Sequence, residues 1–318
     1  TRRAPLGRSI TASSNMRTMI CRRIRTELLH DCQQKKNMSE SLFMSGSFAE
    51  PMALTPKFKR EFVKVIERFI RDYLRESGRK GIIIAMSGGL DSSVVAALCA
   101  RSVGPERTAG LHLPYRDSPK QDERDARELA NSLGISFNSI PIDDLVEAFL
   151  ALEDTEDRVR RGNIIARCRM VVLYHAAHSM DHIVAGTSNK SELLVGYFTK
   201  YGDGASDIAP IGDLYKTQVR GLAKELGIPE HVLEKTPSAA LWPGQSDEEE
   251  LGISYDELDP VLLGIELGFN AEDIVERTGL DAAKVDRIVE RVEKSVHKRR
   301  LGLIPKVGIS TVGLDWRE

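Results

Sequence analysis

The amino-acid sequence predicts an α/β fold, a doubly wound and mainly parallel sheet with helices on both faces. Two observations carry this prediction. Apolar segments with the length of buried strands alternate with segments of helical periodicity, which is the pattern of parallel strands joined by crossover helices. The segment Gly81 to Met86 is a branched apolar run that leads directly into a Ser-Gly-Gly turn and a helix, as expected of a strand buried on both faces.

The first 50 residues differ in composition from the rest of the chain. They contain nine Lys and Arg against four Asp and Glu, with no sustained periodicity and few large apolar residues. Such a segment buries too little apolar surface to fold by itself. We expect residues 1–51 to be a basic extension, either disordered or an artefact before a natural start at Met52, and residues 52–318 to form a single domain.

The elements of this domain follow one another in a regular order. Helical periodicity begins at Thr55 and ends near Gly78. The opening strand and its helix come next. The following pairs of strand and helix are expected at 108–113 with 122–133, and at 136–142 with 143–152. A long helix at 163–180 then leads to a fourth strand at 182–187.

The last third of the chain is less regular. Residues 196–214 are too rich in Gly and Asp for a regular element, and a helix follows at 215–226. An acidic stretch runs from Asp247 to Asp259, and a final amphipathic helix is expected at 281–300. The irregular loop and the acidic stretch are candidate lids that exclude water from a site. Structured surface segments are the alternative interpretation.

The turn between the first strand and its helix predicts a phosphate site. It lies at the carboxyl end of a parallel strand, where a helix N-terminus offers free N–H groups and a positive dipole end. Gly88 and Gly89 permit a close backbone approach, and Ser87, Ser92 and Ser93 add hydroxyl groups. A Ser-rich helix cap without a ligand is the alternative. The polar turn 188–192 follows the fourth strand and is expected at the same edge of the sheet.

Charge and composition limit the classes of function. After the extension, 36 Lys and Arg face 43 Asp and Glu, so a large nucleic-acid surface is not expected. No apolar run approaches the ~18 residues of a membrane span. The cysteines lack zinc-like spacing, which favours a reduced cytoplasmic setting; they are Cys21, Cys32, Cys99 and Cys168.

Several motifs together resemble the NAD synthetase family. They are SGGLDSS at 87–93, NIIARCRM at 163–170, GTSNKSELLVGYFTKYGDG at 186–204, LYKTQVR at 214–220, PSA at 237–239 and HKR at 297–299. The FTKYGDG part is the specific one, since SGGxDS also occurs in other pyrophosphate-loop enzymes. The resemblance covers residues 52–318 and implies a catalytic domain with the adenine nucleotide alpha hydrolase-like fold. Larger members carry an additional N-terminal glutaminase domain, so this chain is expected to be the ammonia-dependent form.

The resemblance implies a two-step ligase reaction. The carboxylate of deamido-NAD attacks ATP to give an acyl-adenylate and pyrophosphate, and ammonia then displaces AMP. Asp91, Glu192 and Lys216 would be catalytic, with Asp91 and Glu192 holding Mg²⁺. The implied ATP-binding residues are Ser87, Gly88, Gly89, Leu90, Asp91, Ser92, Ser93, Thr187, Lys216 and Ser238. The implied deamido-NAD residues are Arg167, Lys200, Asp207, His297 and Lys298.

Two other functions remain open at this point. One is a different pyrophosphate-loop enzyme, an adenylating amidotransferase or a tRNA-modifying enzyme; the latter would need a broad basic surface or a zinc-binding Cys set. The other is a non-catalytic ATP-binding protein, which is disfavoured because Asp91, Glu192 and Lys216 are all present. The resemblance further implies a cytoplasmic homodimer with no nucleic-acid or membrane partner. Delivery of ammonia by a separate glutaminase stays open.

Overall fold

The structure, a computed structural model, describes residues 54–116, 118–152, 155–242 and 244–312. The chain divides into two units after Met52, and the expected extension at 1–51 lies outside the described residues. Everything that follows concerns the second unit. Within its described part, no helix is long and apolar enough to cross a membrane.

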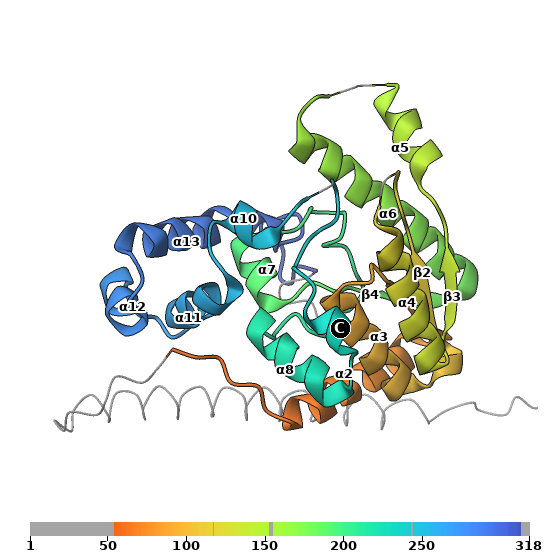
Figure 1. Ribbon diagram of the computed structural model, residues 1–318, viewed down its shortest axis with the longest axis horizontal. Coiled ribbons are helices and arrows are strands. Elements are labelled where there is room, and N and C mark those ends of the chain that lie inside the picture. Colours follow the sequence, from red (N-terminus) through yellow and green to blue (C-terminus); the bar gives the residue numbers. More distant parts are fainter. Residues whose placement is uncertain (1–53, 117, 153–154, 243, 313–318) are drawn as a thin grey trace, which may run out of the picture. The chain divides into compact units, whose positions relative to one another are not determined.

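The described residues form a four-stranded parallel sheet, which confirms the predicted fold class (Figure 1). The strand order is β3-β2-β1-β4, so the chain winds outward from β1 in both directions. Ile208 adds an isolated parallel bridge to Ala185 beyond the last strand. The strands are β1 (Gly81–Ala85), β2 (Thr108–His112), β3 (Ser136–Ser139) and β4 (His182–Ala185).

Alternation along β1 gives the sheet two buried faces. Ile82 and Ile84 pack in one core cluster with residues of α2, α3, α4 and α8. Ile83 packs in a second cluster with residues of α5 and α6. All three side chains are at most 2% exposed. The helices on the first face are α2 (Glu61–Ser77), α3 (Leu90–Val103), α4 (Lys120–Leu133) and α8 (Lys216–Leu226); those on the second are α5 (Asp143–Leu150) and α6 (Arg158–Met180).

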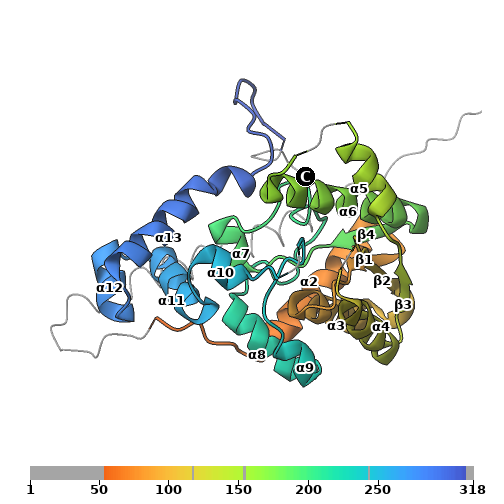
Figure 2. The same cartoon turned by 45° about the horizontal axis from the view of Figure 1, so that its top comes forward.

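A third core cluster joins the remaining helices, which gather away from the strands in Figures 1 and 2. Its centre is Tyr255, which is fully buried together with Leu258 and Val261. These elements are α7 (Lys190–Val195), α10 (Asp247–Leu251), α11 (Tyr255–Glu266), α12 (Ala271–Thr278) and α13 (Ala282–Lys294), while α9 (Glu230–Leu233) follows α8. Short 3-10 turns occupy Pro105–Arg107 and Val296–Lys298.

Several observed boundaries differ from those expected. Helix α2 begins at Glu61, six residues later than expected, because Leu54 is buried and Phe58 packs against Gly221. Helix α6 begins five residues earlier, since the Asp157 carboxylate accepts hydrogen bonds from two N–H groups of its first turn. The acidic stretch from Asp247 is helical and packs in the third core cluster.

Candidate active site

The turn between β1 and α3 leaves a helix N-terminus open. Gly88 adopts a positive φ of 78°, and a Cβ on it would lie 2.2 Å from the backbone oxygen of Asp122. Gly89 precedes α3, and no side chain caps the helix. The Ser92 and Ser93 hydroxyls donate to the Gly89 carbonyl and stabilise the turn; their contact with ATP stays a prediction. The open N–H groups are suited to an anion.

Three charged side chains meet beside this N-terminus, as the sequence predicts. Asp91 lies in the first turn of α3, Glu192 in the first turn of α7 after β4, and Lys216 begins α8. The Lys216 ammonium contacts Asp91 Oδ2 and lies 3.4 Å from Glu192 Oε1. It also faces the Tyr255 ring at 5.2 Å. Because β1 and β4 are neighbours, their carboxyl ends place these groups together.

Burial and mutual charge shift the pKa values of this group. Burial, with the nearby Asp91 charge and against the opposing effect of Lys216, raises the pKa of Glu192 to about 8. Burial also lowers the pKa of Lys216, but Asp91 and Glu192 outweigh it and raise the pKa above its usual value. Three acidic groups, Asp91, Glu192 and the nearby Asp247, therefore act electrostatically on the single Lys216 ammonium.

Two residues of the site were not predicted. Asn189 caps α7 and donates to Asp91 Oδ1 at 3.2 Å, so it links the two carboxylate-bearing helices. Its spacing to Glu192 is that of a capping box, a signal that the sequence does contain. Asp247 is 4% exposed, and its Oδ1 atom has no partner among the described residues. Nothing in an acidic stretch distinguishes one buried Asp from its exposed neighbours.

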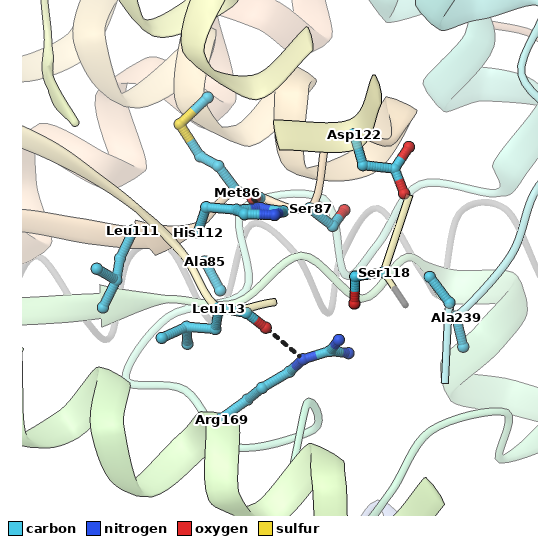
Figure 3. Close-up of a pocket in the computed structure, with 11 residues that line it drawn as sticks. Ala85, Met86, Ser87, Leu111, His112, Leu113, Ser118, Asp122, Arg169 and Ala239 are labelled. Atoms are coloured by element: carbon cyan, nitrogen blue, oxygen red, sulfur yellow. Dashed lines mark hydrogen bonds between the residues drawn. The ribbon is translucent and has the colours of Figure 1, made fainter. Parts of the chain in front are cut away.

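A cavity of about 70 Å³ adjoins the turn at the ends of β1 and β2 (Figure 3). Its walls include Ser87, apolar side chains such as Leu111, and Ala239 from the segment after α9. The Arg169 guanidinium at its edge donates to the Leu113 carbonyl at 3.0 Å. The cavity thus combines apolar and polar walls and lies beside the open helix N-terminus.

The remaining residues expected to bind ATP lie around this region. Thr187 is half-buried two residues after β4. Ser238 is exposed, and its hydroxyl accepts a hydrogen bond from Ala240, a residue of the cavity wall. No observation tests their contact with ATP, so these assignments stay predictions.

Four of the five residues expected to bind deamido-NAD come together. Lys200 Nζ donates to the carbonyls of His297 and Arg300 at 2.7 and 2.9 Å. Arg167 donates to the Lys200 carbonyl at 3.4 Å, and Lys298 Nζ donates to the carbonyls of residues 196 and 198 at 2.7 and 2.9 Å. The fifth residue, Asp207, makes a different contact: its carboxylate accepts a hydrogen bond from the Val184 N–H of β4.

A second acidic group lies elsewhere. Within the described ranges, Asp125, Glu128 and His231 bring possible ligand atoms within 4.8 Å of one another. The Asp125 carboxylate already pairs with Lys235. This group is on α4 and α9 and does not include the expected Mg²⁺ ligands Asp91 and Glu192.

The fold and the sheet-edge residues place the protein in the class of nucleotide-binding α/β enzymes. The family model for NAD synthase matches residues 62–302. The chain therefore belongs to the NAD synthase family, and it is a ligase.

Relatives and solved structures agree with this assignment. The NH(3)-dependent NAD(+) synthetase of Archaeoglobus fulgidus is 48% identical over 250 residues, covering 77% of this chain and 98% of the relative. The NH(3)-dependent NAD(+) synthetase of Pyrococcus horikoshii is 47% identical, and the match covers 80% of this chain and 98% of the relative. The structure of NMN synthetase from Francisella tularensis matches with a TM-score of 0.70 at 38% identity, covering 78% and 99%. The NH3-dependent NAD synthetase from Campylobacter jejuni has a TM-score of 0.67 at 32% identity, covering 78% and 98%.

Proposed function

We propose that the protein catalyses the ATP-dependent amidation of deamido-NAD to NAD with ammonia. The observation that carries this proposal is the convergence of Asp91, Glu192 and Lys216 beside the uncapped N-terminus of α3. A phosphate-binding helix end next to acidic groups and a buried lysine suits the transfer of an adenylyl group. Membership of the NAD synthase family supports the choice of acyl substrate.

The reaction proceeds in two steps. A carboxylate oxygen of the substrate attacks the α-phosphorus of ATP, and the bond to pyrophosphate breaks. Ammonia then attacks the carbonyl carbon of the adenylate, AMP leaves, and the nitrogen loses a proton. The α3 N–H groups orient the phosphates, and the Lys216 ammonium neutralises charge that develops during the attack. The apolar cavity wall holds the base and excludes water.

We propose that Asp91 and Glu192 hold Mg²⁺. Both carboxyl groups contact Lys216, and two carboxyl groups close together beside the phosphate turn suit a divalent cation. Magnesium typically binds one or two carboxylates and completes its shell with phosphate oxygens and water. When bound, it would neutralise the phosphates of ATP. Homodimer formation and a cytoplasmic location stay predictions from the family resemblance.

A product assay tests the function directly. Purified protein with deamido-NAD, ATP, Mg²⁺ and ammonium should form NAD, AMP and pyrophosphate in equal amounts. Formation of ADP and phosphate would contradict the adenylate route. ATP binding without pyrophosphate release would support a non-catalytic role instead.

Two further arms define the substrates. Nicotinate mononucleotide in place of deamido-NAD is included because a structural neighbour is an NMN synthetase; faster turnover with the mononucleotide would reassign the acyl substrate. Glutamine in place of ammonium should give little product, and equal rates would contradict the ammonia-dependent assignment.

A further inference from the structure

Lys235 connects the phosphate turn to helix α4. It lies two residues after α9. Its ammonium donates to the Gly88 carbonyl at 2.9 Å and to Asp122 Oδ1 at 2.8 Å, and it also contacts Asp125 Oδ2. The two carboxylates belong to α4, whereas the carbonyl belongs to the turn before α3. A single side chain therefore joins three segments that are far apart in the sequence.

Three oxygen atoms hold the Lys235 ammonium. It donates hydrogen bonds to the Gly88 carbonyl and to Asp122, and it forms an ion pair with Asp125. Burial lowers the pKa of Lys235, but its interactions with the Asp122 and Asp125 carboxylates outweigh this effect, so the pKa is raised. The charge is neutralised inside the protein, and the geometry suits positioning rather than direct phosphate binding.

The turn at Gly88, which Lys235 contacts, also packs tightly against helix α4. The Gly88 backbone, with its positive φ, packs so closely on α4 that a Cβ would lie 2.2 Å from the Asp122 oxygen. Lys235 fixes the carbonyl of the same peptide. The orientation of this peptide governs how the following N–H groups of α3 face a ligand.

The segment that follows Lys235 forms part of the cavity. Ala239 and Ala240 line it together with Ser87 and Asp122, and Figure 3 shows Ala239 on the same side as Asp122. Fixing Lys235 therefore fixes the phosphate turn and the start of this wall together. The two parts of the site that would enclose a nucleotide share one anchor.

We propose that Lys235 is a positioning residue for ATP, which aligns the phosphate turn with the cavity wall through Asp122 and Asp125. The choice of ATP as the ligand rests on the proposed function. Asp125 provides a stricter test of this proposal, because its side chain is 1% exposed and does not line the cavity. Any effect of Asp125 on ATP binding must pass through Lys235 and α4.

Calorimetric titration of full-length variants with ATP and MgCl₂, without deamido-NAD, tests the proposal. Lys235→Met should weaken ATP binding about tenfold, equivalent to about 1.4 kcal/mol, and Lys235→Arg should restore most of it. Asp125→Asn should weaken binding less, and the double variant should be no weaker than Lys235→Met, since coupled residues are not additive. The exposed Lys224→Met on α8 is the matched control.

Steady-state kinetics separate positioning from a general loss of structure. The KM for ATP should rise in Lys235→Met while the KM for deamido-NAD changes less than twofold. Unchanged ATP affinity in Lys235→Met, an equal rise of both KM values, or strict additivity with Asp125→Asn would overturn the proposal. The titration needs no amide formation. A wild-type protein that binds ATP but forms no NAD would therefore refute the proposed function, while the ATP affinities of the Lys235 and Asp125 variants would still test this proposal.

Discussion

Two groups of cationic side chains, each at least partly buried, differ in the type of acceptor that they contact. At the sheet edge, Lys216 and Lys235 are paired with carboxylates, and both have raised pKa values. Near the last helix, Lys298 and Arg299 donate mainly to backbone carbonyls. Their pKa values are lowered, first by burial and then by neighbouring arginines, although Asp203 partly opposes this for Lys298.

The difference shows how one domain can serve two kinds of ligand. Carbonyls satisfy N–H donors without cancelling charge, so the region around Lys298 keeps its positive charge and suits an anionic dinucleotide. The sheet edge has an excess of carboxylates and suits a cation that accompanies ATP. We refer to these regions as the basic end and the sheet edge.

The largest expected effect tests the sheet edge. Asp91→Ala or Glu192→Ala should lower kcat by about 10³-fold, because charge stabilisation in a dry site is lost. The folded state should persist, as judged by circular dichroism. Glu290→Ala, which removes an exposed carboxylate on α13, is the control and should leave kcat unchanged. Near-normal turnover in either variant would show that the substituted residue is not catalytic.

A smaller effect is expected at the basic end. Lys298→Met should raise the KM for deamido-NAD roughly tenfold, about the loss of one charge-assisted contact, and change the KM for ATP little. The exposed Lys294→Met serves as the control. A larger rise in the KM for ATP would show that the two regions do not divide the ligands as proposed.

The smallest effect concerns stability and pH in the ligand-free protein. The pKa of Glu192 is about 8 in the folded state, against an ordinary value of 4.5. A raised carboxyl pKa contributes stability that is complete below pH 4.5 and is lost as pH rises through 8. The unfolding temperature should decrease as the pH is raised from 5 to 8, and the decrease should be several degrees smaller in Glu192→Gln. If the unfolding temperatures of the wild type and Glu192→Gln changed equally with pH, the raised pKa would not belong to Glu192.

Local patterns predicted most of the fold. The apolar run of β1 and the glycine turn are decided by neighbouring residues, and they appear where expected. The start of α2 was wrong because Leu54 and Phe58 pack against residues far along the chain. The third strand ends at Ser139 rather than at 142, where Ile140 still donates to the His112 carbonyl. Such boundaries depend on tertiary packing rather than on propensity.

The same division applies to the site. Sequence pattern was enough to predict that the turns carrying Asp91 and Glu192 converge, because the carboxyl ends of adjacent parallel strands meet at one edge. Lys216 was assigned from the family resemblance, and it begins α8. Asp247 and Lys235 could not be found in that way. Lys235 contacts Gly88 and Asp122 across more than 100 residues, and Asp247 is buried against Tyr255 in the packed core. Burial and charge pairing arise from the packing of distant segments, and no local periodicity encodes them.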